Sequence, residues 1–464
     1  MENVFHRIKR FAGKWIDLES SFFLKNSSWL FLDQGSRVVI SFLGSIIIAR
    51  GLGADLFGKY TILITLVATI QQFVNFNIGS AVIKFGAEYK AAGQFSKLAL
   101  LVTGSYAFTA LTAIASIGIV AISATLLYDL FFDVPGLNAL LVIYAVGTAF
   151  SFLDALSKAL LRLFYKFKIN AVINVVMAFI ELIVVAITLY FYPRDLFVLI
   201  IALAGTKALN AFICFGAAYW ELRPELGPLS RPSWSDILDQ GKEMWGFVLG
   251  TSGSNSLKRL VKRGDVLLLG ILASSTEIAY YAIAKKLATS ILAITDPLSY
   301  SIYPQLATLV SQGKLAQLKK MLRNVTVLLS LPFLAFILLA ILLGEQIITL
   351  AYGVEFAGAG GALLFVLAAT SVEAVLFWTV SLLNSFNLVA VRFKVYTVGA
   401  LLGLLLAWLL VPSYGAAGMG VAILCMNLLI QASFAYVNLR AIHTHQPARP
   451  VAEPKELAES QENV

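Results

Sequence analysis

Phe333-Leu-Ala-Phe-Ile-Leu-Leu-Ala-Ile-Leu-Leu343 is a stretch without a single polar side chain. Strands of a membrane β-barrel alternate polar and apolar residues over about ten positions, because one face meets lipid and the other meets the lumen. A continuously apolar run instead favours an α-helix, which satisfies its backbone hydrogen bonds internally. If similar stretches recur along the chain, the fold class is an all-α membrane protein.

The composition extends this prediction to the whole chain. Of the 464 residues, 59% are hydrophobic and only 13% are charged, and the mean hydropathy is +0.84. A soluble domain carries about 25% charged residues because water must solvate its surface. Most of this surface therefore faces lipid. Lysines and arginines number 35 against 26 acids, and the resulting net charge of +9 is typical of nucleic-acid binding or of cytoplasmic membrane-protein loops.

Twelve apolar stretches are each long enough for a helix to cross about 30 Å of hydrocarbon. Their approximate limits are 29–50, 59–83, 97–127, 137–163, 167–192, 195–219, 243–272, 277–306, 320–344, 360–386, 391–412 and 414–439. With the N-terminus inside, 23 of the 35 basic residues fall in cytoplasmic segments, three near the outer side and nine within spans. This distribution follows the positive-inside rule. We therefore expect a polytopic protein with twelve transmembrane helices and both termini in the cytoplasm.

The two halves of the sequence are similar to each other. Arg50-Gly-Leu-Gly-Ala-Asp-Leu-Phe-Gly-Lys-Tyr60 is matched by Ile271-Leu-Ala-Ser-Ser-Thr-Glu-Ile-Ala-Tyr-Tyr281, about 221 residues later. Tyr165-Lys-Phe-Lys168 is matched by Val391-Arg-Phe-Lys394, about 226 residues later. Six helices followed by six with the same sidedness predict a parallel internal repeat, that is, two six-helix bundles. Two facing bundles are the geometry for alternating access.

The repeat also predicts the domain boundaries. We expect a cytoplasmic amphipathic segment over 1–28, bundles over 29–219 and 243–439, a Pro-containing cytoplasmic linker over 220–242, and a disordered cytoplasmic tail over 440–464. Apolar residues at helical spacing among basic ones fit either an interfacial helix or an ordinary basic tail for the first segment. The last segment is rich in glutamate and has no apolar pattern, which is typical of disorder.

Few residues in this chain are suited to catalysis or metal binding. Both cysteines, Cys214 and Cys425, lie in apolar stretches, and the three histidines lie near the termini. These positions exclude most His-based catalysis and any Cys-rich metal site. We expect no enzyme active site, no metal and no cofactor.

The seventh span carries an unusual concentration of charge. Four cations lie near its middle, namely Lys258, Arg259, Lys262 and Arg263. They share one half of the helix at about 100° per residue. Four central cations cost roughly 10–14 kcal/mol to insert, whereas about ten apolar residues return only about 3–6 kcal/mol. We therefore expect this face to line a water-filled cationic cavity. The alternative, a cytoplasmic surface helix, leaves only about eleven residues between Asp265 and Glu277 to cross the bilayer.

Other charges at membrane depth are candidates for function or for structural pairing. Asp33 with Arg37, and Asp154 with Lys158, are four residues apart, which is typical of ion pairs on one helix face. Acids within spans are also candidates for ion coupling or gating, and these are Asp33, Asp154, Glu181, Asp265, Asp296 and Glu373.

The intramembrane charges do not balance. Lys207, Lys285 and Lys286 complete the nine cations, which against six acids leave a charge of +3 that suits an anion. Asp296 precedes Pro297, which has no backbone N–H to donate and so predicts a kink that could hold an ion or act as a hinge.

These residues resemble bacterial polysaccharide flippases, the O-antigen and exopolysaccharide branch of the multidrug/oligosaccharidyl-lipid/polysaccharide exporter superfamily. The similarity is carried by Ile48-Ala-Arg-Gly-Leu-Gly53, Phe57-Gly-Lys-Tyr60, Asp265-Val-Leu-Leu-Leu-Gly270 and Ala279-Tyr-Tyr281. It implies a MATE-like fold in the bacterial inner membrane. It also implies transfer of undecaprenyl-pyrophosphate-linked oligosaccharide to the outer leaflet, and contacts with a polysaccharide polymerase and glycosyltransferases. Proton or sodium coupling stays open.

The candidate site follows from combining the charges with this resemblance. Fixed cations can hold a pyrophosphate, and the candidates are Arg37, Lys258, Arg259, Lys262 and Arg263. Candidate sugar contacts are Gln71, Gln72, Asn75, Tyr281 and Tyr300. For the tyrosines, ordinary aromatic packing is the alternative.

Other functions predict different sequences. A multidrug antiporter of the same superfamily should carry acids and aromatics in its cavity rather than clustered cations. A peptidoglycan-precursor flippase typically has fourteen spans. A non-transporting scaffold or a membrane-embedded polymerase is disfavoured by the doubled architecture, and a polymerase should have larger outer loops than the roughly 15 residues found here.

Overall fold

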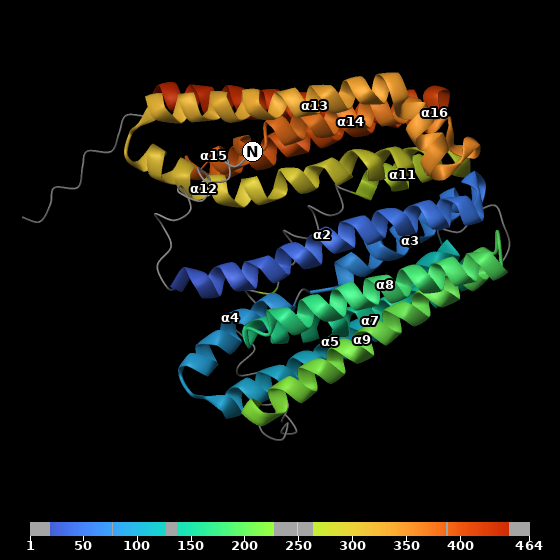
Figure 1. The fold of residues 1–464 in the computed structure, drawn as a ribbon, viewed down its shortest axis with the longest axis vertical. Coiled ribbons are helices and arrows are strands. Elements are labelled where there is room, and N and C mark those ends of the chain that lie inside the picture. Colours follow the sequence, from blue (N-terminus) through green and yellow to red (C-terminus); the bar gives the residue numbers. More distant parts are fainter. Residues whose placement is uncertain are drawn as a thin grey trace, which may run out of the picture. The chain divides into compact units, whose positions relative to one another are not determined.

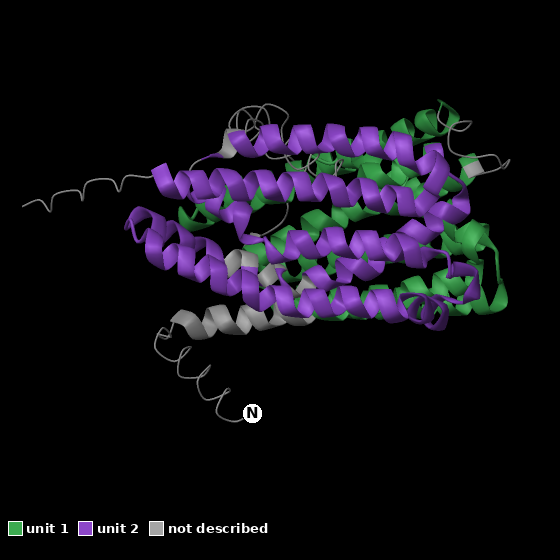
Figure 2. Ribbon diagram, turned by 90° about the horizontal axis from the view of Figure 1, so that it is seen from above, with its two compact units in different colours: residues 1–271 green, residues 272–464 purple. Residues whose placement is uncertain are grey.

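The structure, a computed structural model, describes residues 19–76, 78–126, 137–226, 248, 263–386 and 388–444. Across these residues the chain forms helices joined by short turns, with no strand (Figure 1). The all-α prediction is confirmed. The chain divides into two compact units, Met1–Ile271 and Leu272–Val464 (Figure 2). The sequence predicted that the two bundles are divided by a linker over 220–242. In the structure, the described end of the seventh span, from residue 263 to residue 271, belongs to the first unit.

The first unit is built around one central helix. Its helices are α2 (Glu19–Leu52), α3 (Ala54–Val74), α4 (Ile78–Ala91), α5 (Phe95–Leu126), α7 (Leu137–Leu163), α8 (Phe167–Phe191) and α9 (Leu196–Leu226), with further helix from residue 263. α7 is central because it packs against α3, α4, α5, α8 and α9. α2 packs mainly against α8.

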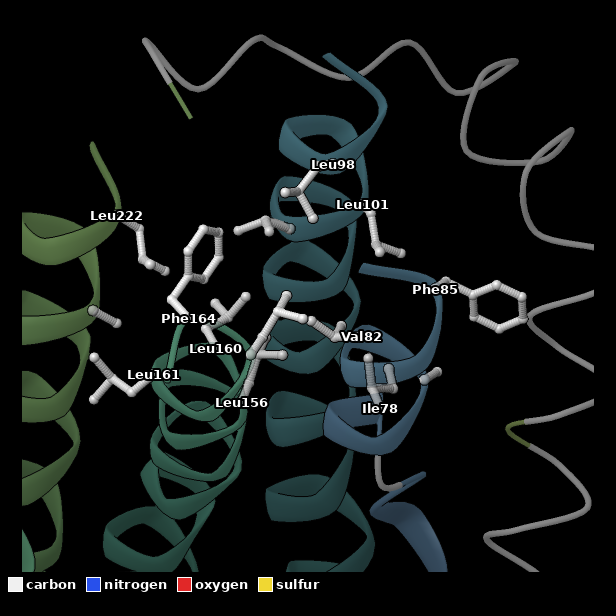
Figure 3. Close-up of a cluster of buried hydrophobic side chains, with 14 of the residues drawn as sticks. Ile78, Val82, Phe85, Leu98, Leu101, Leu156, Leu160, Leu161, Phe164 and Leu222 are labelled. Carbon is white, nitrogen blue, oxygen red and sulfur yellow. The ribbon is translucent and has the colours of Figure 1, made fainter. Parts of the chain in front are cut away.

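An apolar cluster joins α4, α5, α7 and α9 (Figure 3). Figure 3 shows Val82 of α4, Leu98 of α5 and Leu160 of α7 among the side chains that fill the space between these helices, with Leu222 on α9. Lipid is as apolar as these side chains, so close packing rather than escape from water holds such helices together. Small residues allow that packing, as where Gly147 of α7 lies directly against Ala204 of α9.

The second unit contains the remaining described helices. These are α11 (Ser275–Ser290), the short 3-10 helix η1 (Ile291–Ile294), α12 (Asp296–Ser311), α13 (Leu315–Tyr352), η2 (Val354–Phe356), α14 (Ala359–Val375), α15 (Trp378–Ser385) and α16 (Val389–Thr444). α16 comprises two helices joined at Gly415, whose φ of 52° and ψ of −130° are not helical. This bend separates the predicted eleventh and twelfth spans.

The internal repeat is visible in the backbone. The turn between α4 and α5 and the turn between α12 and α13 each contain a glycine with positive φ, 68° at Gly93 and 65° at Gly313. The next residue donates its N–H to the carbonyl five residues earlier, Gln94 to Tyr89 at 2.9 Å and Lys314 to Leu309 at 3.0 Å. Left-handed backbone favours glycine, so the two halves place it at the same point of the same helix-ending turn.

The second and eighth spans are interrupted at equivalent places. α3 ends at Val74 and α4 begins at Ile78, and Asn75, directly after α3, is extended with φ −83° and ψ 98°. The sequence did not predict this break, although asparagine readily leaves a helix because its side chain competes for backbone hydrogen bonds. In the eighth span, η1 and Thr295 separate α11 from α12. The α-helix is therefore interrupted just before Pro297, which lies in the first turn of α12.

Nine segments of the described chain are long and apolar enough to cross a membrane. They cover predicted spans one to six and nine to twelve, the last two within one bent segment. α13 shows what surrounds them, because its most apolar stretch has a mean hydropathy of 2.8 while only 11% of that stretch is buried. Leu328, Leu331 and Leu334 on this helix are all exposed. The protein is a multi-pass membrane protein whose outer surface suits lipid.

Candidate functional site

The cationic seventh span is described only at its end. Lys258, Arg259 and Lys262 lie outside the described residues, so their arrangement stays a prediction. Arg263 begins the described part of the helix and is partly exposed. Its guanidinium lies within electrostatic range of the Tyr144 hydroxyl on α7. Two residues further, the Asp265 carboxylate accepts a hydrogen bond of 2.7 Å from the Val266 backbone N–H.

Arg37 is held by the predicted ion pair with Asp33. The Arg37 Nε lies 2.9 Å from the Asp33 Oδ1, and the side chain of Arg37 is 48% exposed while that of Asp33 is 3% exposed. The other Asp33 oxygen accepts a hydrogen bond of 3.1 Å from the Asn174 amide of α8. The aspartate is thus anchored between two helices, and it orients a guanidinium whose side chain is about half exposed.

Asp154 and Lys158 also form the predicted pair. The Lys158 Nζ lies 2.7 Å from the Asp154 Oδ2, and both side chains are mostly buried. On the same face of α7, Ser157 bonds the Tyr106 hydroxyl of α5 at 2.8 Å. These contacts belong to the packed interior of the first unit, where α7 meets α5 and α9.

A third ion pair was not predicted from the sequence as a pair. The Lys207 Nζ of α9 lies 2.9 Å from the Oε1 and 2.8 Å from the Oε2 of Glu181 on α8. The two residues are 26 positions apart, so no helical spacing indicates the contact. The sequence does indicate that Glu181 faces the protein interior. At about 100° per residue it lies on the same face of its helix as Asn170 and Asn174.

The candidate sugar contacts are placed in different ways. Gln71 is buried and its amide donates a 3.0 Å hydrogen bond to the Ala145 carbonyl of α7. Tyr281 is 1% exposed. Gln72 and Asn75, at the end of α3, are partly exposed. Tyr300 lies in α12, but its side chain is outside the described set. Among the candidate sugar contacts whose side chains are described, the accessible ones are therefore those at the end of α3, whereas Gln71 and Tyr281 are buried.

The two candidate acids of the second unit lie on different helices. Asp296 is the first residue of α12, and its side chain is outside the described set. Glu373 of α14 is partly buried and lies within electrostatic range of Tyr396 on α16. Within the described ranges, no three His, Cys, Asp or Glu side chains gather as a metal site would require.

Comparison with known proteins agrees with the fold. The sequence model of a family described as "Polysaccharide biosynthesis protein" matches residues 47–359. No curated protein sequence matches the chain.

Solved structures match over most of their length. An inward-facing multidrug resistance MATE family transporter of the MOP superfamily has a TM-score of 0.67 at 12% identity, covering 88% of this chain and 94% of that one. The lipid II flippase MurJ in an inward closed conformation has a TM-score of 0.61 at 13% identity, covering 89% of both chains. A mutant of the Vibrio cholerae MATE transporter VcmN has a TM-score of 0.59 at 12% identity, covering 92% of this chain and 97% of that one. At such identities the similarity establishes the fold alone, so the cargo must be argued from the residues.

Proposed function

Because the chain belongs to the polysaccharide biosynthesis protein family, we propose that it is a flippase for undecaprenyl-pyrophosphate-linked oligosaccharide repeat units. It moves them across the bacterial inner membrane by alternating access, with both termini in the cytoplasm. A lipid-linked sugar cannot cross unaided, because its polar head would have to enter hydrocarbon. The protein supplies a hydrated path for the head while the prenyl tail stays in lipid.

The observation that carries this proposal is that Arg37 is accessible while its ion-pair partner is buried. A cation within a membrane span costs about 2.5–3.5 kcal/mol, yet the Arg37 side chain is 48% exposed beside an aspartate side chain that is 3% exposed. The buried carboxylate, held by Asn174, fixes the orientation of the half-exposed arginine side chain. An arginine fork with free donors is suited to a phosphate group.

The other proposed pyrophosphate ligands are Arg263 and the three cations that lie outside the described residues, Lys258, Lys262 and Arg259. In this proposal the four cations surround the anionic pyrophosphate. A helix that faced lipid could not carry so much positive charge. Gln72 and Asn75, at the break between α3 and α4, are proposed to bind sugar hydroxyls. Movement of the two bundles would expose the cations first to the cytoplasm and then to the outer side.

The multidrug antiporter alternative needs carboxylates able to bind organic cations. In the described part of the first unit, the intramembrane carboxylates of Asp33, Asp154 and Glu181 each contact a lysine or arginine. Acids neutralised in this way attract an organic cation poorly. The lipid II flippase is the closer alternative, because its cargo is also a lipid-linked sugar precursor.

Reconstituted transport separates these alternatives. Purified protein is placed in vesicles with lipid-linked oligosaccharide, and arrival of the sugar at the opposite leaflet is measured with a membrane-impermeant lectin. We expect oligosaccharide transfer and no efflux of a cationic dye. Dye efflux without oligosaccharide transfer would refute the proposal and favour the antiporter, and transfer of lipid II alone would favour the peptidoglycan precursor.

A further inference from the structure

We propose that Lys207 is a second binding position for the cargo's pyrophosphate, and that Glu181 is an internal counter-ion which the pyrophosphate displaces. The inference rests on the proposed flippase function and adds to it a site, a ligand group and an exchange step. In the empty protein the carboxylate takes the place that phosphate oxygens take in the loaded protein.

The geometry of the pair resembles the contact that a phosphate would make. The Lys207 Nζ is nearly equidistant from both Glu181 oxygens, at 2.9 and 2.8 Å. An ammonium offers three donors, and a phosphate presents two or more anionic oxygens at a similar separation. When phosphate oxygens replace the Glu181 oxygens, the charge of Lys207 stays neutralised. No unpaired cation is then left at membrane depth.

Both side chains point away from lipid. The exposed stripe of α8 includes Val176, Phe179 and Ile183, and at about 100° per residue Glu181 lies on the opposite side of the helix. Lys207 is likewise opposite the exposed stripe of α9, on which Phe212 is 63% exposed.

The pair also lies deep within its helices. Glu181 is about 21 Å along α8 from Phe167 and about 15 Å from Phe191, at 1.5 Å per residue. The pair therefore sits near the middle of the hydrocarbon layer, on the interior side of the first unit.

Accessibility distinguishes this pair from Asp154 and Lys158. The side chains of Lys207 and Glu181 are 30% and 35% exposed, although both face away from lipid. The Lys158 and Asp154 side chains are 17% and 11% exposed. The pairs Asp154–Lys158 and Asp33–Arg37 each join residues four apart on one helix, whereas Glu181 and Lys207 come from two helices. Part of each side chain is accessible, and a rotamer change of either one separates the partners.

Neighbouring groups can stabilise both states. The Tyr144 hydroxyl lies within electrostatic range of Glu181, Lys207 and Arg263, and the Tyr60 hydroxyl within range of Tyr144 and Glu181. Phenolic hydroxyls donate to a carboxylate or to a phosphate oxygen. Two phenolic hydroxyls are therefore within electrostatic range of Glu181, and they contribute to the charge balance around the exchange.

Binding of inorganic pyrophosphate tests the exchange without requiring transport. Isothermal titration calorimetry on the full chain in nanodiscs compares the unaltered protein with Glu181→Gln, which keeps the shape of the side chain but removes the competing charge. We expect Glu181→Gln to bind about tenfold more tightly, the effect of removing one competing charge-assisted hydrogen bond. The double variant Glu181→Gln with Lys207→Gln should lose this gain.

Asp55→Asn is the matched control, because it removes the same charge from an exposed ion pair with Lys59 and should leave the affinity unchanged. The exchange is overturned if Glu181→Gln binds no more tightly, or if the gain survives in the double variant. Should Glu181→Gln not fold, Glu181→Asp shortens the carboxylate's reach and should give a smaller gain that Lys207→Gln again removes. If the protein transfers oligosaccharide but the variants do not show these affinity changes, the exchange is refuted and the flippase function stands. If the affinity changes are found but no oligosaccharide is transferred, the flippase function is refuted and the exchange stands.

Discussion

Replacing Gly147 with alanine should force the central helix α7 away from α9. A Cβ at Gly147 would lie 2.9 Å from the Ala204 carbonyl oxygen and closer still to the Ala204 Cα and Cβ. Carbon atoms ordinarily approach to about 3.5–4.0 Å, so the two helices must separate locally by roughly 1 Å. Backbone atoms cannot rotate out of the way. Overpacking of this kind costs about 1–3 kcal/mol.

Gly205→Ala is the matched control, since it lies on α9 next to the contact and its added Cβ meets nothing within 4 Å. Both substitutions gain up to about 1 kcal/mol of helix propensity, so the difference between them isolates the steric cost. Gly147→Ala should be the less stable by about 1–3 kcal/mol.

Unfolding by SDS in mixed micelles, followed by circular dichroism, measures this difference. Tyr144 and Lys207 each lie about one turn from the contact, on α7 and α9 respectively. Gly147→Ala should therefore also weaken pyrophosphate binding, while Gly205→Ala should not. Equal stabilities of the two variants, within about 0.5 kcal/mol, would refute the argument that close backbone approach holds these helices together.

Three further substitutions test individual contacts by the same unfolding measurement. Glu277→Gln should lower stability by about 1–2 kcal/mol, because the carboxylate accepts a 2.6 Å hydrogen bond from the Ala416 N–H at the bend in α16 and charge-assisted bonds are the stronger ones. Asp33→Asn should cost about 1–3 kcal/mol, since it leaves the paired arginine without its buried carboxylate; no loss would show that the pair is not structural. Lys166→Gln should change stability by less than about 1 kcal/mol, because its bond with Glu221 is about one-third exposed at both ends, and a larger loss would contradict this.

Features that depend on local sequence were predictable. Continuously apolar runs located the spans, because a helix in lipid must satisfy its own backbone and face apolar surroundings. Spacing of four residues was sufficient to pair Asp33 with Arg37 and Asp154 with Lys158, since such positions are neighbours on a helix surface. Pro297 indicated the interruption of the eighth span because proline lacks an N–H.

Features that depend on how helices pack were not predictable from local sequence. The Asn174 amide reaches Asp33 from 141 residues away, and the register of α2 against α8 decides that contact. Gln71 was assigned to sugar binding from its residue type, but its orientation toward α7 places it against the Ala145 carbonyl. The contact between Glu181 and Lys207 likewise required the relative rotation of two helices.

Transfer of lipid-linked oligosaccharide by a variant without the central cations tests the proposed function most directly. Lys258, Arg259, Lys262 and Arg263 are replaced together by glutamine, and vesicles with equal amounts of inserted, folded protein are compared with the unaltered chain. If these cations hold the pyrophosphate, transfer should fall by at least about tenfold, as expected for the loss of one or more charge-assisted contacts. Transfer at the unaltered rate by the correctly inserted variant would contradict an anionic lipid-linked cargo held by these residues.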